Sequence, residues 1–231
     1  MSAAVVVAVL LALFSYAEAG FCCPNSLSQS DSARQIFLDF HNDVRRNIAL
    51  GNGLINWTVN ADAVILGPAQ NMYKVDWDCN LEEVAAQQIA PCNDPLPINT
   101  SLAQNIARWL YFKDSEEETV LQQVSWYWVS ASLGFMKGTK LDQFANQWAE
   151  PLANIANYRN RKVGCAHKIC PAQQNMVVSC VYGSPKLAPN EVIWQEGKAC
   201  VCDARPDSFC CDNLCDTRDA ASVRHQCCAS P

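Results

Sequence analysis

The sequence predicts an α+β domain in which helices pack on a sheet, followed by a disulfide-rich extension. Three observations lead to this fold class. Helical periodicity dominates the chain up to about residue 156, β-branched runs lie between residues 163 and 182, and seven of the 14 cysteines fall in the last 32 residues. The chain is also long enough to bury a hydrophobic core of its own.

The chain opens with an uncharged apolar run at residues 3–14, followed by a small-x-small sequence at residues 17–19. The run is shorter than the ~20 residues that span a bilayer as a helix. We therefore predict a signal peptide over residues 1–19, cleavage between Ala19 and Gly20, and a secreted, extracellular protein without a membrane anchor. A buried N-terminal helix is the alternative, which the cleavage sequence disfavours. The predicted boundaries are residues 20–190 for the main domain with its short N-terminal arm, and 191–231 for the extension.

The composition argues against several partners. The formal net charge is −6, or −5 once Glu18 leaves with the signal peptide, and no basic run interrupts this acidity. Nucleic acid and anionic membranes are therefore not expected as partners. Fourteen cysteines in a secreted chain favour seven disulfides over metal ligation. Two sequons predict N-glycosylation at Asn56 and Asn99.

Helices are expected first. The helix over residues 31–49 carries one apolar stripe at helical spacing, places Arg45 and Arg46 off that stripe, and is ended by Gly51. A weaker helix is predicted over residues 61–73, and another over residues 80–89. The negative charges of Glu82 and Glu83 are interpreted as a solvated helix start.

The clearest helix spans residues 115–133, because Ser115 and Glu118 form a capping-box pattern at its start and Gly134 follows its end. A further helix is expected over residues 142–156, interrupted near Pro151. The β-branched runs at residues 163–168 and 176–182 predict two paired strands, and residues 192–195 suggest a third.

Four motifs occur in order along residues 30–216. They are the His41-Asn42-x-x-Arg45 sequence, the Trp77-Asp78-Cys79 segment with its following Leu81, the strand pair around Cys165 and Cys180, and the cysteine spacing of the extension. Together they closely resemble the CAP superfamily, which groups cysteine-rich secretory, antigen 5 and pathogenesis-related proteins. The form is similar to nematode venom-allergen-like, or activation-associated, secreted proteins. The resemblance implies an α-β-α sandwich and a disulfide between Cys165 and Cys180.

In the family that this chain resembles, many members have a central cleft in which two histidines and two glutamates can hold a divalent metal. Carried onto this chain, those four positions fall on Asn93, Gln104, Val129 and Pro151. Zinc and magnesium need imidazole or carboxylate ligands, which none of these side chains offers. We therefore predict that the cleft binds no metal and that the protein has no cofactor.

Catalysis is not expected either, because only His41, His167 and His225 could act as a base. The resemblance assigns His41 a structural role. His167 lies two residues after Cys165, so a Cys/His dyad and a disulfide beside a surface histidine are both conceivable, and the disulfide is favoured. His225 lies within the terminal cysteine cluster, and residues 116–118 are interpreted as another solvated helix start.

Cysteine counts constrain the extension. Residues 20–190 and the extension each hold seven cysteines, so complete pairing within one chain requires at least one bridge between them. Apart from the pair that the resemblance implies, the partners cannot be deduced. These cysteines are Cys22, Cys23, Cys79, Cys92, Cys170, Cys200, Cys202, Cys210, Cys211, Cys215, Cys227 and Cys228.

Four functions remain as hypotheses. The first is a non-enzymatic scaffold that recognises host proteins through its surface. The second is a carrier of a small lipid such as a sterol or fatty acid, seated between apolar helices. A toxin activity of the extension against channels or proteases, and an enzymatic activity, are less favoured. The oligomeric state cannot be predicted.

Overall fold

The computed structural model describes residues 20–52, 65–99, 101–136 and 141–217. The predicted signal peptide, Asn56, His225, Cys227 and Cys228 lie outside these residues. Within the described part of the chain, no helix is both long and apolar enough to cross a membrane.

A four-stranded sheet lies at the centre, in the order β2-β4-β5-β3. Its long strands are β4 (Lys162–Cys170) and β5 (Asn175–Tyr182), which pair antiparallel as the sequence predicts. The edge strands β2 (Asp76–Trp77) and β3 (Gln104–Leu110) were not predicted. Each of these two strands pairs with one neighbour only. Their residues are accordingly a mixture of polar and apolar types.

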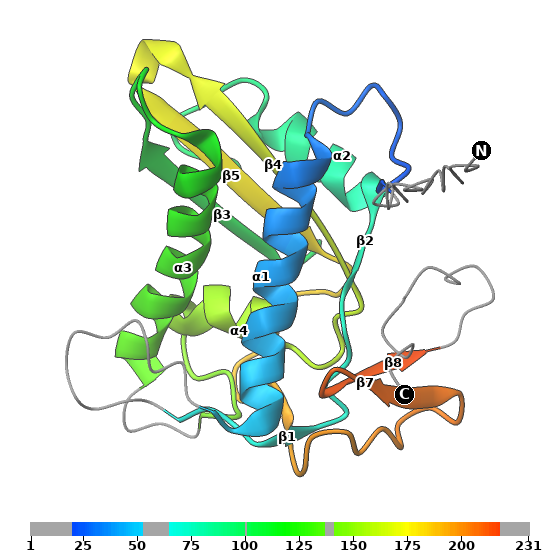
Figure 1. Cartoon of the computed structure of the whole chain (residues 1–231). Helices are drawn as coiled ribbons and strands as arrows, with labels where there is room; N and C mark the ends of the chain where they lie inside the picture. Colours follow the sequence, from blue (N-terminus) through cyan, green and yellow to red (C-terminus); the bar gives the residue numbers. More distant parts are fainter. Residues whose placement is uncertain (1–19, 53–64, 100, 137–140, 218–231) are drawn as a thin grey trace, which may run out of the picture.

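Helices cover both faces of this sheet, which confirms the α-β-α sandwich (Figure 1). On one face, α1 (Asp31–Leu50), α3 (Glu117–Met136) and α4 (Glu150–Ala156) bury the larger apolar cluster. On the other face, α2 (Cys79–Ile89) packs on β4 and β5 over a smaller cluster. Short 3-10 turns at Gln147–Ala149 (η2) and Pro171–Gln173 (η3) complete the main domain.

Helix α1 forms where the sequence predicts it. The Ser30 hydroxyl accepts a hydrogen bond from the Ala33 amide at 3.1 Å, which caps the first turn. Gly51 ends the helix in the left-handed conformation, at φ 67°, where a Cβ atom would be strained. The predicted helix boundaries are therefore confirmed to within one residue.

Several local predictions were wrong. Residues 65–73 are not helical: β1 (Ala69–Gln70) pairs with β6 (Gln195–Glu196), so tertiary pairing overrides a weak helical pattern. Of the strand predicted at residues 192–195, only Gln195 lies in a strand, which is β6 of this small separate sheet, and Val192 forms an isolated bridge with Gln143. Of the helix predicted over residues 142–156, the part before η2 is irregular. Pro151 does not interrupt this helix, because it occupies the first turn of α4, where proline is tolerated.

The capping box at Ser115 is also absent. The Ser115 hydroxyl accepts from the Phe112 amide at 3.1 Å, so it closes the preceding turn, and α3 begins two residues later than predicted. Gly134 lies within α3, which continues to Met136. Glycine lowers helix stability without forbidding the helix, so it is an unreliable end signal.

The extension folds back onto the main domain through a hairpin of β7 (Ser208–Cys211) and β8 (Leu214–Thr217). Backbone bonds join the Cys215 amide to the Met72 carbonyl at 2.8 Å and the Asn71 amide to the Val201 carbonyl at 2.8 Å. The Asn71 side chain also donates to Asp203 at 2.7 Å. The extension is therefore fixed to the segment after α1, as Figure 1 shows.

Candidate functional site: the groove between α1 and α3

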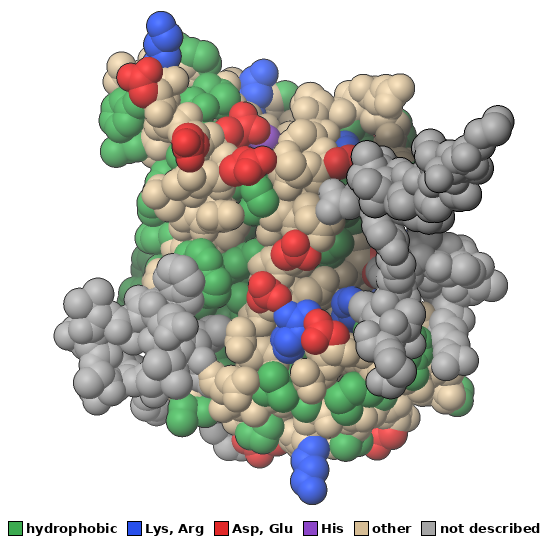
Figure 2. Space-filling view, viewed as in Figure 1, with side chains coloured by type: hydrophobic (Ala, Val, Ile, Leu, Met, Phe, Trp, Pro, Cys, Tyr) green, Lys and Arg blue, Asp and Glu red, His purple; other side chains and the backbone are tan. Residues whose placement is uncertain are grey.

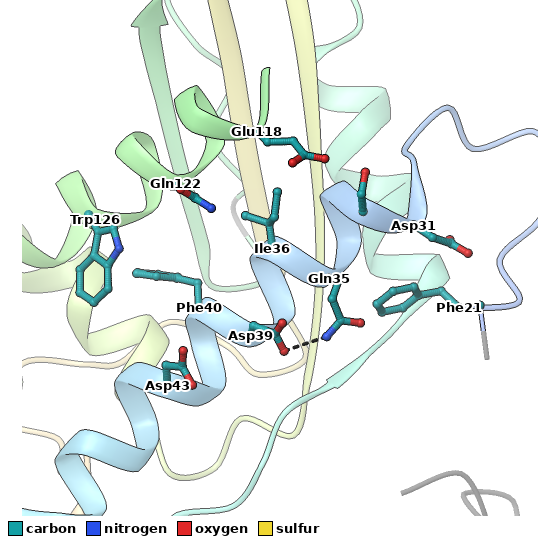
Figure 3. Close-up of a pocket in the computed structure, with 12 residues that line it drawn as sticks. Phe21, Asp31, Gln35, Ile36, Asp39, Phe40, Asp43, Glu118, Gln122 and Trp126 are labelled. Carbon is teal, nitrogen blue, oxygen red and sulfur yellow. Dashed lines mark hydrogen bonds between the residues drawn. The ribbon is translucent and has the colours of Figure 1, made fainter. Parts of the chain in front are cut away.

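A groove on the described surface lies between α1, α3 and the N-terminal arm (Figure 3). It has a volume of about 560 Å³, within the range of roughly 300–1,000 Å³ that is typical of ligand sites. Both helices lie on the same face of the sheet, so their facing sides form the two walls. Its lining residues are Gly20, Phe21, Asp31, Ser32, Gln35, Ile36, Asp39, Phe40, Asp43, Glu118, Gln122 and Trp126.

The floor of this groove is apolar and rigid. Phe40 of α1 is almost fully buried and packs edge-to-face on Trp126 of α3, with ring centroids 5.0 Å apart. Ile36, one turn earlier on α1, is half-buried beside them (Figure 3). Edge-to-face aromatic packing favours one arrangement of the two rings, so it also fixes the spacing of the two helices.

The rim is acidic. Asp31, Asp39 and Asp43 lie along α1, and Glu118 faces them from the first turn of α3 (Figure 3). No lysine, arginine or histidine is among the lining residues that the structure describes. In Figure 2, acidic side chains accordingly follow the line between the two helices.

These four carboxylates differ in how far they are neutralised. Asp31 pairs with Arg34 at 2.6 Å, and Asp43 pairs with Arg46, so both have a neighbouring cation. Asp39 accepts only an amide hydrogen bond, from Gln35 at 2.7 Å. Among the described residues, neither Asp39 nor Glu118 has a basic partner, so the middle of the groove keeps its negative charge.

The N-terminal arm closes one end of the groove. Phe21 packs edge-to-face on Trp77, with ring centroids 5.5 Å apart. A disulfide between Cys23 and Cys79 fixes the arm to the start of α2. The arm is therefore part of the site, although nothing in its sequence pattern indicated that.

A buried ion pair fixes the other side of α1. Glu82 of α2 has no exposed surface and accepts from Arg34 Nε and Nη2, both at 2.8 Å, and from Trp77 Nε1 at 2.8 Å. This hydrogen bonding raises the pKa of Arg34. The prediction of a solvated Glu82 was wrong, because a charge pattern at a helix start does not reveal a cation on another helix.

Arg45 is a second buried cation, although the sequence placed it off the apolar stripe. Its guanidinium donates to the carbonyls of Tyr73, Ile155, Asn157 and Asn160 at 2.8–3.2 Å. Burial lowers its pKa. Arg45 thereby joins α1 to α4 and to the segment before β4.

His41 is fully buried in the core, and both of its ring nitrogens are hydrogen-bonded. Its Nδ1 donates to the Phe37 carbonyl at 2.6 Å, and its Nε2 accepts from the Tyr182 hydroxyl at 2.9 Å. Burial lowers its pKa to about 4, so the ring is neutral at pH 7. Cys165 and Cys180 lie close to His41, but their sulfurs form a disulfide and both ring nitrogens are engaged.

His167 is not a surface histidine. This corrects the favoured interpretation, a disulfide beside a surface histidine, in its description of the histidine. Its side chain is about 10 % exposed, and Nε2 pairs with Glu117 at 3.0 Å. Burial lowers its pKa, although Glu117 opposes that shift. Because Cys165 is bridged to Cys180, the Cys/His dyad does not form. Glu117 also has this tertiary role, which the prediction of a solvated helix start had missed.

Comparison with known proteins assigns the family. The model of the cysteine-rich secretory protein (CAP) family matches residues 38–182, which hold most of α1, all of α2, α3 and α4, and the central sheet. The chain belongs to the CAP family. It is 31 % identical over 220 residues to Ancylostoma secreted protein from Ancylostoma caninum, covering 92 % of this chain and 49 % of that protein. It is 27 % identical over 141 residues to the cysteine-rich venom protein VAR10 of Varanus varius, covering 59 % of each.

Solved CAP structures show the same fold. The crystal structure of Na-ASP-1 matches with a TM-score of 0.65 at 29 % identity, covering 87 % of this chain and 49 % of that one. Hookworm platelet inhibitor matches with a TM-score of 0.62 at 21 % identity, covering 84 % and 94 %. NaASP2 with Zn²⁺ matches with a TM-score of 0.65 at 22 % identity, covering 84 % and 100 %. This chain spans about half the length of Ancylostoma secreted protein and of Na-ASP-1, and somewhat more of VAR10.

The structure describes all four positions at which the resemblance places metal ligands, namely Asn93, Gln104, Val129 and Pro151. The Gln104 side chain donates to Gln88 and Ser179, both at 2.9 Å, on the sheet face that α2 covers. Val129 is fully buried in the apolar cluster on the opposite face, and Pro151 begins α4. Asn93 is exposed in the loop after α2. With one amide turned away, one apolar side chain and one proline, this donor set does not fit zinc or magnesium.

Five disulfides are described in this CAP protein. Cys23–Cys79, Cys92–Cys170 and Cys165–Cys180 lie in the main domain, and the Cys165–Cys180 bridge is the one that the resemblance implies. Cys200–Cys210 and Cys202–Cys215 lie in the extension. Cys22 and Cys211 belong to none of these five pairs, and Cys227 and Cys228 lie outside the described residues. The expected bridge between main domain and extension therefore stays a prediction.

Proposed function

We propose that this CAP protein is a secreted, non-enzymatic scaffold whose α1–α3 groove binds a protein segment that presents basic and apolar side chains. One observation carries the proposal: an aromatic floor lies beneath an acidic rim on which Asp39 and Glu118 have no basic partner, and no basic side chain is among the described lining residues. A lysine or arginine has an apolar stem and a cationic head, so one side chain can contact both floor and rim. The relatives named as secreted proteins support an extracellular site of action. A host protein is the expected source of such a segment.

Several features support a role without catalysis. Both ring nitrogens of His41 are engaged in the core, and His167 pairs with Glu117. Neither ring is hydrogen-bonded to a serine or cysteine nucleophile among the described contacts, and the nearby Cys165 sulfur is oxidised. Recognition needs none of these groups, because a rigid surface with satisfied buried polar groups can bind without chemistry.

A small-lipid carrier is the second candidate, and the apolar floor favours it. Phe40, Ile36 and Trp126 could contact an alkyl chain or a sterol. The rim argues against a fatty acid, because its carboxylate would face Asp39 and Glu118 without a cation to pair with. A neutral sterol meets no such repulsion, so the two lipid classes give different expectations.

The proposal can be tested with two designed peptides that share one amphipathic pattern. One carries leucine and lysine, and the other carries leucine and glutamate. We expect fluorescence anisotropy to show saturable binding of the lysine peptide alone. The affinity should fall as ionic strength rises, because the rim charges are exposed to solvent. Equal binding of both peptides, or of neither, would contradict the proposal.

A matched pair of variants locates the site. Glu118→Gln removes a rim charge. Glu116→Gln removes a charge two residues earlier in the chain, and Glu116 does not line the groove. We expect Glu118→Gln to weaken binding of the lysine peptide about threefold, since an exposed charge pair contributes roughly 0.2–1 kcal/mol. Glu116→Gln should leave the affinity unchanged. Bound oleate or cholesterol that the lysine peptide does not displace would favour the lipid candidate.

A further inference from the structure

A second groove lies along the other side of α3, where that helix meets the edge strand β3. Its volume is about 400 Å³. Gln122 and Trp126 line both grooves, so α3 separates them. The lining residues of this α3–β3 groove are Trp109, Thr119, Gln122, Gln123, Trp126, Tyr127 and Ser130.

Two aromatic rings form adjoining walls of this groove. Trp109 of β3 and Tyr127 of α3 lie with their ring centroids 5.2 Å apart and their planes inclined by 57°. Tyr127 is 48 % exposed, so its ring is accessible to a ligand. The face of an aromatic ring is electron-rich, so it attracts weakly positive C–H groups that are arranged in a flat array.

The remaining lining side chains are neutral hydrogen-bonding groups. Gln122 and Gln123 are exposed, and each amide offers two donor hydrogens and one acceptor oxygen. Neither amide has a hydrogen-bond partner among the described residues. Thr119 and Ser130 add hydroxyls, which already contact Glu116 and the Tyr127 carbonyl. No charged residue is among the described residues that line this groove, in contrast to the acidic rim across α3.

We propose that the α3–β3 groove binds a neutral oligosaccharide. A pyranose ring presents C–H groups on its flat faces and hydroxyls around its edge. Its faces therefore suit the Trp109 and Tyr127 rings, and its hydroxyls suit the amides of Gln122 and Gln123. An alkyl chain would leave those amides without partners, and an acidic glycan would find no cation. This proposal does not depend on what the α1–α3 groove binds.

The test uses the mature, full-length protein after enzymatic trimming of its own N-glycans, so that no attached glycan competes. Saturation-transfer NMR measures binding of four neutral probes, which are chitotetraose, cellotetraose, maltotetraose and mannotetraose. A heparin tetrasaccharide and 3′-sialyllactose serve as charged probes. We expect saturable binding of at least one neutral probe and of neither charged probe.

Variants then place the sugar on the groove. We expect Tyr127→Ala to weaken binding of that probe about tenfold, equivalent to about 1.4 kcal/mol, and Gln123→Ala to weaken it by a similar factor. Phe135→Ala is the matched control: Phe135 is also 48 % exposed on α3 but stacks on Trp148 and does not line the groove. The Phe135→Ala variant should bind the probe with unchanged affinity. Thermal unfolding checks that each variant is folded.

Three results would overturn the proposal. The first is no binding of any neutral probe at concentrations up to about 10 mM, which lies above the millimolar Kd of a weak complex. The second is binding of the charged probes at least as tight as that of the neutral ones. The third is an equal loss of affinity in Phe135→Ala and Tyr127→Ala. Failure of the peptide experiment on the α1–α3 groove would leave this proposal unaffected.

Discussion

Replacing Glu82 with glutamine should destabilise the fold, because Arg34 would keep its charge in a buried position without a full counter-charge. Arg34 Nε and Nη2 both donate to the Glu82 carboxylate at 2.8 Å, and Glu82 has no exposed surface. Removing one partner of a buried pair typically costs about 3–5 kcal/mol. Asp31 also pairs with Arg34 and is about half exposed, so we expect the lower end, about 3 kcal/mol.

Urea unfolding of the secreted, oxidised protein measures this change. A loss of about 3 kcal/mol corresponds to a fall in Tm of roughly 6–12 °C for a chain of this size. Glu83→Gln is the matched control, because Glu83 is exposed and accepts only from Gln87 at 3.1 Å. That change should stay within about 0.5 kcal/mol. A loss below about 1 kcal/mol in Glu82→Gln, or an equal loss in both variants, would refute the reasoning.

Three further outcomes are expected. Because burial lowers the pKa of His41 to about 4, the folded state binds fewer protons than the unfolded state between about pH 6.5 and 4. The free energy of unfolding should therefore fall by about 3 kcal/mol as pH falls through that window, and His41→Gln should flatten this urea-unfolding profile. Gly164→Ala should lower the free energy of unfolding by about 3 kcal/mol in the same assay, since a Cβ there would lie 2.1 Å from the Glu82 amide nitrogen. Gly134→Ala, with open space around it, should instead stabilise α3 by about 0.5–1 kcal/mol. Millimolar Zn²⁺ should leave Tm unchanged, because the positions of the family's metal ligands carry no suitable donors; a rise in Tm that saturates with Zn²⁺ would contradict this.

The sequence predicts those parts of the fold whose signals are local. Helix α1 has its cap, its stripe and its terminal glycine within one segment, and β4 and β5 are short runs in which valine, isoleucine and cysteine recur. The edge strands β2 and β3 lack such a signal, because their pairing depends on strands far along the chain. The prediction of a helix at residues 61–73 was wrong over the described residues 65–73 for the same reason, since β6 pairs with residues 69–70.

The candidate site was harder to predict than the fold. Stripes on the two helices indicated that both bury apolar surface, but not that Asp39 and Glu118 would line one groove from opposite sides. Phe21 belongs to the groove through a disulfide whose partners the sequence could not identify. Charge patterns also misled at Glu82 and Arg45, because a buried ion pair and a carbonyl-bound guanidinium have no local sequence signature.

The predicted domain boundaries at residues 20, 190 and 231 and the glycan at Asn99 stay predictions. The family model covers residues 38–182, which lie within the proposed main domain. Asn99 is half-buried, and its side-chain oxygen accepts from the amides of Ser101 and Leu102 at 2.9 and 2.8 Å. Peptide mapping of the secreted protein would test whether the N-terminus is Gly20 and whether Asn99 carries a glycan.

Native mass spectrometry of the mature protein from eukaryotic cells, with and without the leucine–lysine peptide, tests the role of the acidic groove most directly. A single spectrum reports bound peptide, retained lipid and metal. We expect a one-to-one peptide complex, weakened in Glu118→Gln but not in Glu116→Gln, on a protein free of lipid and metal. A stoichiometric lipid that the peptide does not displace, or equal binding of the leucine–glutamate peptide, would contradict the account.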